Sequence, residues 1–272
     1  MIRYKVLAEF CRVYSEIVKD FYGFLGRRKC YICGKNFFKY LPIYNDAWYR
    51  DQLKENGINF HFTDATYNRN EYRCPYCGAI DRTRFLMLYI HKNYRIKRNI
   101  KLLYFAPVWG GLDFLRKKMK NIKVHTADLY EDKVDYQLDI QNLEGIDDAA
   151  YDLIICSHVL EHVDHDKAAL KELYRVLKYG GEALILVPLD LKRGWFDEEL
   201  GLSPHENWKR FGQGDHVRRY THVEIIKRIR EAGFQCKMFT RSDVEERLVK
   251  ENAFMKNIRI YRAKKERLHE RL

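Results

Sequence analysis

The sequence predicts an α/β fold built on a mostly parallel, doubly wound sheet. Two short apolar runs, residues 153–156 and 183–187, lack polar alternation, which is typical of strands covered on both faces. Between them, from Asp166, apolar residues recur at helical spacing, and Gly180 and Gly181 are expected to end that helix. A strand, a crossover helix and a parallel strand form the right-handed unit of such a sheet.

Composition bounds the possible classes of protein. The 272 residues suffice for one large or two small domains, and a hydrophobic content of 46% is enough for a sizeable core. The net charge is +12, which favours an anionic partner such as nucleic acid, a membrane surface or a phosphorylated substrate. The same charge could also serve solubility alone.

Seven cysteines, in two CxxC pairs and three single positions, do not resemble a secreted disulfide framework. They indicate a reducing compartment, and we expect a cytoplasmic protein. No apolar run is long enough for a transmembrane helix. Charged residues at Lys5, Glu9 and Arg12 interrupt the N-terminal apolar stretch, so no signal peptide is expected.

The first region, residues 1–29, is predicted to be an amphipathic helix. Apolar residues recur every three or four positions over residues 2–25, and Arg27, Arg28 and Lys29 follow them. A basic amphipathic helix can make peripheral contact with an anionic membrane, but its apolar face more often packs on its own protein or on a partner chain.

The second region, residues 30–95, contains two CxxCG motifs. Each motif places two thiolates on one tight turn, and four thiolates in tetrahedral geometry select zinc. The set offers no open position, so we expect a structural zinc ion; a redox pair or unliganded cysteines are the alternatives. The four expected ligands are Cys30, Cys33, Cys74 and Cys77.

Between the two motifs, residues 35–73 interleave aromatic with basic side chains. Such a mixture can stack the bases of RNA, but it more often forms the core of a small irregular domain, which we favour. Residues 81–94 are predicted to form a connector helix.

A third region, residues 96–265, carries the predicted sheet. Strands are expected at residues 101–105 and 123–127, and a capped helix at 221–233. Residues 234–240 and 258–263 alternate as strands and are expected to pair antiparallel at one edge. Residues 266–272 form a charged tail.

The stretch YDLIICSHVLEHV…ALKELYRVLKYGGEALILVP, residues 151–188, resembles the middle of the class I S-adenosylmethionine-dependent methyltransferases. The resemblance extends more weakly over residues 97–265. It implies a Rossmann-like sheet, S-adenosylmethionine as cofactor and methyl transfer as the activity; the alternative is a generic Rossmann-like unit with another ligand. A zinc-knuckle segment before such a core resembles a group of bacterial enzymes of this class.

The family's glycine-rich turn is altered in this chain. Of the D-x-G-x-G-x-G pattern only Gly110 is kept, while Ala106 and Val108 replace the first two glycines and Tyr104 replaces the acid. Val108 lacks the freedom of glycine at positive φ, which would weaken cofactor binding, yet we expect binding because later positions match.

Those later positions are acidic residues. Asp128, about twenty residues past the turn, is placed to hold a ribose through its hydroxyls. The resemblance puts Leu129 beside the adenine and Asp139 at its amino group. The full set of expected cofactor contacts is Phe105, Ala106, Pro107, Gly110, Asp128, Leu129, Asp139, Ile140, Ser157 and His158.

Residues 189–220 form a long polar connection after the second buried strand, and long connections are often functional lids. A general base is expected among His216, Asp215 and His158, whereas His162 is expected to brace the loop rather than to act in catalysis. A surface excursion is the alternative for the whole segment. The residues predicted to bind substrate are His205, Arg210, Gln213, Arg218 and Tyr220.

The sequence therefore predicts methyl transfer to a hydroxyl or amine of a small-molecule or glycan acceptor. An RNA methyltransferase that binds RNA through the basic zinc segment is one alternative. The other is a non-catalytic binding protein that kept the fold but has a degenerate cofactor loop.

Overall fold

The computed structural model describes residues 27–43, 51–52, 54–57, 68–189, 191 and 194–266. Its centre is a seven-stranded sheet of order β10–β11–β7–β6–β3–β4–β5. All pairs from β5 to β7 are parallel, and β11 is antiparallel to both neighbours, as predicted for the edge. The strands are β3 (Ile100–Phe105), β4 (Ile122–Asp128), β5 (Tyr136–Gln137), β6 (Tyr151–Ser157), β7 (Leu177–Leu186), β10 (Gln235–Thr240) and β11 (Arg259–Lys264).

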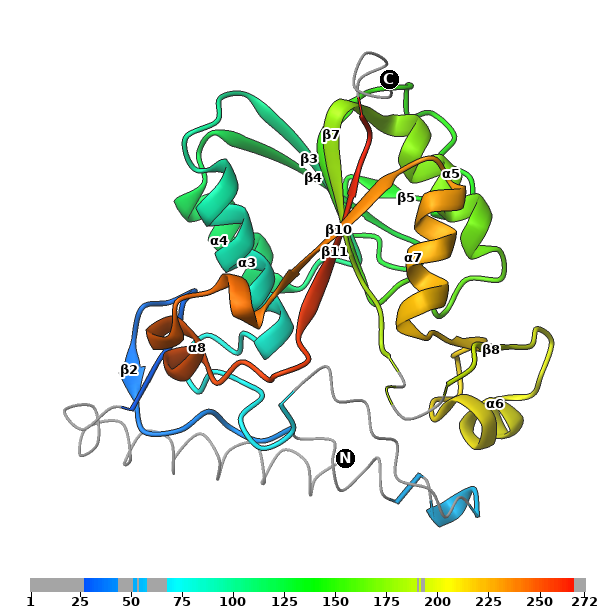
Figure 1. Cartoon of the computed structure of the whole chain (residues 1–272), viewed down its shortest axis with the longest axis horizontal. Helices are drawn as coiled ribbons and strands as arrows, with labels where there is room; N and C mark the ends of the chain where they lie inside the picture. Colours follow the sequence, from blue (N-terminus) through cyan, green and yellow to red (C-terminus); the bar gives the residue numbers. More distant parts are fainter. Residues whose placement is uncertain are drawn as a thin grey trace.

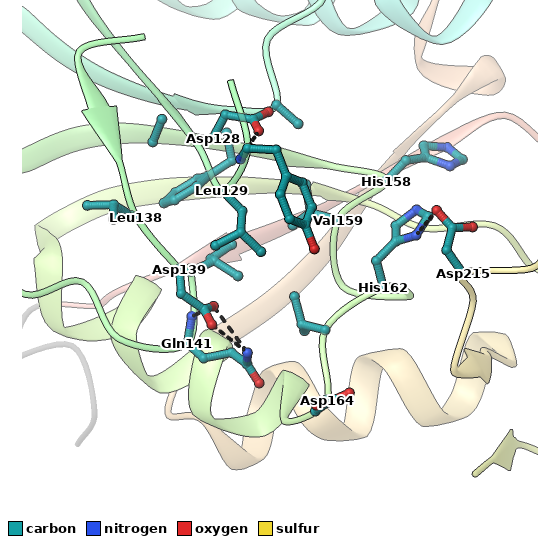
Figure 2. Close-up of a pocket in the computed structure, with 16 residues that line it drawn as sticks. Asp128, Leu129, Leu138, Asp139, Gln141, His158, Val159, His162, Asp164 and Asp215 are labelled. Atoms are coloured by element: carbon teal, nitrogen blue, oxygen red, sulfur yellow. Dashed lines mark hydrogen bonds and ion pairs between the residues drawn. The ribbon is translucent and has the colours of Figure 1, made fainter. Parts of the chain in front are cut away.

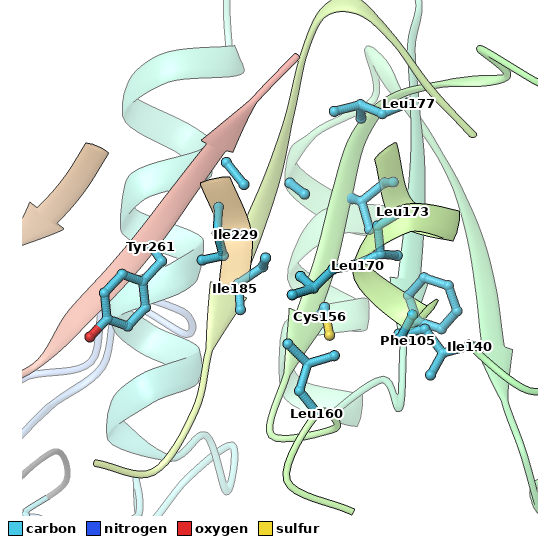
Figure 3. Packing of buried hydrophobic residues seen from close by; sticks show 14 of the residues in the cluster. Phe105, Ile140, Cys156, Leu160, Leu170, Leu173, Leu177, Ile185, Ile229 and Tyr261 are labelled. Carbon is cyan, nitrogen blue, oxygen red and sulfur yellow. The ribbon is translucent and has the colours of Figure 1, made fainter. Parts of the chain in front are cut away.

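Helices cover both faces of this sheet, because its central strands are apolar on both sides. Helices α5 (Asp166–Val176) and α7 (His222–Glu231) lie on one face, and α3 (Asp81–Tyr94) and α4 (Trp109–Lys118) lie on the other (Figure 1). On the first face, side chains of α5 and α7 pack on β6 and β7, and Figure 3 shows Leu170 beside Cys156 and Ile229 beside Ile185.

The predicted connector helix is confirmed as α3, but it does more than connect. Its buried side chains belong to the same apolar cluster as the second face of the sheet. The ring centroid of Phe85, for example, lies 5.0 Å from that of Phe254 and 5.1 Å from that of Phe239. Helix α3 is therefore an integral layer of the sheet's core.

The expectation that Gly180 and Gly181 end the crossover helix is wrong. Helix α5 ends at Val176, and β7 begins at the next residue and runs through both glycines. The register to β6 shifts there, from Tyr151 opposite Leu177 to Leu153 opposite Glu182. A Cβ on Gly181 would lie 2.8 Å from the carbonyl oxygen of Lys178, so the glycines allow a bulge in the strand.

The cysteine-rich segment contains a two-stranded ribbon, β1 (Arg28–Lys29) and β2 (Asn36–Phe37), and lies beside helix α8 (Glu246–Asn252) (Figure 1). Arg84 of α3 is buried between them and donates to the carbonyl oxygens of Tyr72, Ala79 and Asn252. These contacts join the segment to the sheet domain.

The connection between β7 and α7 is more ordered than expected. It contains β8 (Asp197–Glu198), α6 (Pro204–Phe211) and β9 (Arg218–Arg219), and β8 pairs with β9. Helix α6 begins with a capping box between Ser203 and Glu206. A short 3-10 helix, η1 (Arg241–Asp243), follows β10.

Three predictions lie wholly or partly outside the described residues: the helix over residues 2–25, residues 44–50, 53 and 58–67 of the aromatic insert, and all but the first residue of the charged tail. Among the helices that are described, none has the length and apolar character needed to cross a membrane.

Candidate functional site

A cavity of about 500 Å³ opens at the carboxyl ends of β3, β4 and β6, where open α/β sheets bind ligands (Figure 2). Its volume lies in the usual range of small-molecule sites. It is lined by Phe105, Ala106, Ala127, Asp128, Leu129, Tyr130, Leu138, Asp139, Ile140, Gln141, His158, Val159, His162, Val163, Asp164 and Asp215.

Two carboxylates mark one side of the cavity. Asp128 ends β4 and accepts hydrogen bonds from the backbone nitrogens of Tyr130 and Glu131, at 2.8 and 3.1 Å. Asp139 follows β5 and accepts from the backbone and side-chain nitrogens of Gln141. These bonds hold both carboxylates in place, and each keeps lone pairs for a ligand.

The backbone at the two central strand ends is unusual. Ala106 after β3 has φ 45° and His158 after β6 has φ 57°, in the left-handed region that favours glycine. Val108 has φ −83°, so the concern that valine could not replace a glycine there does not apply. Tyr104, in place of the family's acid, accepts a hydrogen bond from the Val108 nitrogen at 3.3 Å. The altered turn is thus an ordered structure of its own.

Most of the predicted cofactor residues meet at this cavity. Seven line it: Phe105, Ala106, Asp128, Leu129, Asp139, Ile140 and His158. Pro107, Gly110 and Ser157 are not among the lining residues. Gly110 instead faces the cysteine-rich segment, where a Cβ would lie 3.5 Å from that of Ala79.

The opposite wall carries a cluster of histidines around Glu161, shown in part in Figure 2. Nδ1 of His158 lies 3.1 Å, and Nε2 of His162 lies 3.9 Å, from Oε1 of Glu161. On its other side, Nδ1 of His162 lies 3.2 Å from Oδ2 of Asp215. The ring of His216 stands edge-on to that of His162, with centroids 4.6 Å apart.

Charge states in this cluster follow from burial and pairing. Burial opposes ionisation of Glu161, but the neighbouring histidines outweigh it and lower its pKa. Burial lowers the pKa of His158, and lowers that of His216 to about 4. For His162 burial is outweighed by Asp215, which raises its pKa.

The five residues predicted to bind substrate do not line the cavity. Two of them brace the loop after β6: Arg218 donates to the carbonyl oxygens of Leu160 and Asp164, and the Tyr220 hydroxyl donates to Asp166. Arg210 pairs with Asp197 at 2.8 Å, His205 contacts Asn56, and Gln213 donates to Asp215.

Among the predicted bases, His158 and Asp215 reach the cavity, while His216 is buried behind His162. His162, assigned by sequence to loop bracing, lines the cavity. The HxxEH spacing of residues 158–162 is visible in the sequence. That His162 and Glu161 lie next to His216 depends on the fold. Sequence reasoning also missed Tyr130, Leu138, Gln141 and Val159, whose only signal is their position next to predicted residues.

The four cysteines of the two CxxCG motifs also come together, with all four sulfurs within 4.8 Å of one another. The Cys30 and Cys77 sulfurs are 3.7 Å apart, and those of Cys33 and Cys74 are 3.8 Å apart. None of the four forms a disulfide bond. Gly34 and Gly78 have φ 72° and 70°, which fits the two equivalent turns predicted from the motifs.

Comparisons with known proteins agree with this geometry. Residues 110–185 match the model of a methyltransferase domain family. A ubiquinone/menaquinone biosynthesis C-methyltransferase from Xanthomonas axonopodis is 31% identical over 100 residues, 32% of this chain and 40% of the relative. A ubiquinone biosynthesis O-methyltransferase from Idiomarina loihiensis is 26% identical over 121 residues, 43% of this chain and 48% of the relative. The chain thus spans less than half of either relative.

One similar solved structure is the 1,6-didemethyltoxoflavin-N1-methyltransferase of Burkholderia thailandensis with bound 1,6-didemethyltoxoflavin and S-adenosylhomocysteine. It is 16% identical, with a TM-score of 0.48, and the match covers 68% of this chain and 79% of that one. The family match falls on the strands and helices that shape the cavity, and their order is the one that the sequence resemblance implies. The chain therefore carries a class I S-adenosylmethionine-dependent methyltransferase domain.

Proposed function

We propose that the chain transfers the methyl group of S-adenosylmethionine to a hydroxyl or amine of a small-molecule acceptor. The observation that carries the proposal is the cavity itself, with two ordered carboxylates on one side and His158 and Asp215 on the other. The wall with Asp128 and Asp139 could bind the cofactor, and the wall with His158 and Asp215 could bind an acceptor.

The cofactor's place follows from the carboxylates. Asp128, at the end of β4, would accept the ribose hydroxyls, and Asp139 would accept the adenine amino group. Leu129 and Ile140, which line the same side, would provide the apolar contact for the adenine ring. When bound, the cofactor supplies an activated methyl group, and the protein's part is to orient the acceptor towards it.

A small acceptor fits the site better than RNA. Of the described aromatic side chains in the cysteine-rich segment, Phe37, Tyr40 and Tyr72 are buried, Tyr31 and Tyr76 are half-buried, and Phe38 is exposed. A stacking platform for bases needs exposed rings. Both curated relatives are named for ubiquinone biosynthesis, which supports a small organic acceptor. A glycan remains the second form that such an acceptor could take.

We also propose that the cysteine-rich segment holds a structural zinc ion. Sulfur atoms about 2.3 Å from a tetrahedral zinc ion are about 3.8 Å apart. The observed spacings of 3.7 and 3.8 Å meet this requirement. Four thiolates would complete the ion's coordination, so it would stabilise the segment and take no part in the chemistry.

Calorimetric titration with S-adenosylmethionine and S-adenosylhomocysteine tests the cofactor site. We expect micromolar binding of both, and a loss of at least tenfold in Asp128→Asn, because the amide replaces a charged acceptor for two hydroxyls. Asp132→Asn, an exposed carboxylate four residues further on, is the matched control. If the wild-type protein binds neither compound, the methyltransferase proposal fails and a non-catalytic role gains support.

Acceptor class is tested with radiolabelled methyl groups. Zinc-replete protein is incubated with labelled S-adenosylmethionine and, separately, with deproteinised metabolites, total RNA and polysaccharide. We expect label in the metabolite fraction. Incorporation into RNA alone, sensitive to ribonuclease, would overturn the small-molecule proposal and favour RNA methylation.

A further inference from the structure

Glu161 is the most unusual ionisable residue of the described chain. Its side chain is 0% exposed, and neither carboxylate oxygen has a hydrogen-bond partner among the described residues. His158 approaches to 3.1 Å, but without the alignment of a hydrogen bond. A buried carboxylate without hydrogen bonds is costly, by about 1–3 kcal/mol. The nearby imidazoles of His158 and His162 balance its charge only when they are protonated, so a bound cation would stabilise this position.

Two histidines converge on this carboxylate from different parts of the chain. His162 lies on the same loop after β6. His216 is brought in by the connection between α6 and β9, because the Val217 nitrogen donates to the Glu161 carbonyl oxygen at 3.0 Å. One oxygen of Glu161 and one nitrogen of each histidine all lie within 4.8 Å of one another.

We propose that Glu161, His162 and His216 form a binding site for a divalent transition-metal ion, separate from the four-cysteine site. Two imidazoles and one carboxylate are a recurrent ligand set for zinc, iron and related ions. Three protein ligands leave open positions, and His162 borders the cavity, so the open side faces the place where small molecules would enter. The four thiols, by contrast, leave no position for a ligand.

Asp215 supplies the supporting interaction that such sites usually have. Metal-bound histidines commonly donate their second ring nitrogen to a carboxylate, which fixes the tautomer and the ring. Here Nδ1 of His162 lies 3.2 Å from Asp215, which leaves Nε2 directed towards Glu161. Asp215 is therefore a positioning residue, and its side chain is 66% exposed, so it can be replaced without disturbing the core.

The metal site would also contribute to the proposed methyl transfer, and this catalytic role rests on the proposed function. If an acceptor oxygen or nitrogen enters beside His158, a metal on the neighbouring wall can bind and polarise it. His216 would then hold the ion rather than accept a proton, and His158 would be the remaining candidate for the base. Metal binding itself does not depend on that step.

The test uses the untagged 272-residue chain, with its thiol site loaded with zinc. Cobalt(II) is titrated by calorimetry and by visible absorption, since thiolate-bound cobalt has intense sulfur bands that nitrogen and oxygen ligands lack. We expect one equivalent to bind without sulfur bands. Glu161→Gln and His162→Gln should each weaken binding by at least a hundredfold, and Asp215→Asn by about tenfold to a hundredfold. His165→Gln, an exposed histidine on the same loop, should bind as the wild type does.

The proposal is overturned if cobalt binds only with sulfur bands, or if Asp215→Asn and His162→Gln, folded by circular dichroism, bind it as tightly as the wild type. S-adenosylmethionine is titrated into the same samples. Cobalt binding without cofactor binding would support the metal site and refute the methyltransferase proposal. Cofactor binding without cobalt binding would refute the metal site alone.

Discussion

At the scale of single residues, the site depends on two non-glycine residues with left-handed backbone. Ala106 and His158 end adjacent strands of the sheet, and both have positive φ. Left-handed backbone costs an L-residue about 1–2 kcal/mol, a cost that other contacts must offset. Such strain is often found at ligand sites, and Ala106 and His158 both line the cavity.

Valine at position 106 should therefore be harmful in two ways. Because β-branched residues tolerate positive φ poorly, we expect Ala106→Val to lower the unfolding free energy by about 1–2 kcal/mol. Its branched side chain should also weaken S-adenosylmethionine binding by about tenfold, measured by calorimetry. Ala149→Val is the matched control, since Ala149 has φ 50° but lies away from the cavity. Equal affinity in both variants would contradict this role for the turn.

Some residues of the site can be predicted from local patterns in the sequence and others cannot, for a physical reason. Asp128 and Asp139 could be predicted because each follows a strand within a short stretch of chain. From the sequence Glu161 can be recognised only as an acid next to His162, because its burial and its approach to His216 depend on contacts between residues 55 positions apart in the sequence. Local patterns carry no information on such contacts.

At the scale of elements, helix α4 is packed through one glycine and not through its neighbour. A Cβ on Gly111 would lie 2.9 Å from the Thr83 methyl and 3.2 Å from the Tyr104 hydroxyl, whereas one on Gly110 would make ordinary contacts. Gly111 thus allows α4 to lie close to α3. Gly110 was the glycine that matched the family pattern, so the packing requirement and the pattern fall on different residues.

The two glycines make a matched pair for mutation. We expect Gly111→Ala to destabilise the protein by about 1–3 kcal/mol, because the buried neighbours must move. Gly110→Ala should be neutral or stabilising by up to about 1 kcal/mol, because alanine favours the helix, and it should leave cofactor affinity unchanged. Thermal and urea unfolding measure the first effect and calorimetry the second. A greater loss of stability at position 110 would refute this packing.

Ion pairs attach the β8–β9 ribbon to the helices behind it. Glu198 accepts hydrogen bonds from Arg218 at 2.6 Å and from Arg228 at 3.0 Å. Burial opposes ionisation of Glu198, but these arginines outweigh it and lower its pKa. A carboxyl group with a lowered pKa stabilises the fold above its unfolded value, about 4.3, and that contribution is lost as the pH falls through the folded pKa.

Glu198→Gln should accordingly be less stable than the wild type at pH 6 and above. The difference should shrink as the pH falls below about 4.3, because the carboxyl group is then protonated first in the unfolded chain and, at lower pH, in the folded protein as well. Urea unfolding between pH 3 and pH 7 measures it, with the exposed Glu144→Gln as control. A difference that stays constant across this range would show that the charge of Glu198 is not involved.

The ends of helices and strands could not be predicted where they depend on an adjacent element of the fold. Helix α3 and the antiparallel edge could be predicted because periodicity and turn residues are local signals. Gly180 and Gly181 were read as a helix stop, but whether glycines end a helix or form a bulge is decided by the adjacent strand. Helix α6 was missed although Ser203, Pro204 and Glu206 are a helix-start signal.

At the scale of the whole molecule, the cysteine-rich segment and the sheet domain form one packed body. The segment contacts α8 through Ala253 and Asn252, and it lies against the start of α4 at Gly110. The N-terminal end of α4, directly after the altered glycine turn, thus packs against the cysteine-rich segment. Loss of the proposed zinc ion should therefore affect the cavity as well as the segment.

Cys74→Ser tests this connection. We expect zinc content to fall from one ion per chain to near zero, measured by mass spectrometry of the metal, and the melting temperature to fall, because metal binding free energy contributes to folding. S-adenosylmethionine affinity should fall as well. Cys236→Ser, on β10 and away from the segment, should match the wild type. A wild-type protein without zinc, or a Cys74→Ser protein of unchanged stability, would refute the structural role.

The contact between the segment and α8 also bears on the order of events during synthesis. The Tyr31 nitrogen bonds to Asn252, and the Arg28 guanidinium bonds to the Lys250 carbonyl oxygen, across 221 and 222 positions of chain. When the two CxxCG motifs leave the ribosome, their docking partner has not been made. A metal ion bound early to the four thiols would stabilise this segment during that interval, and the segment could dock on α8 only after residue 252 has been made.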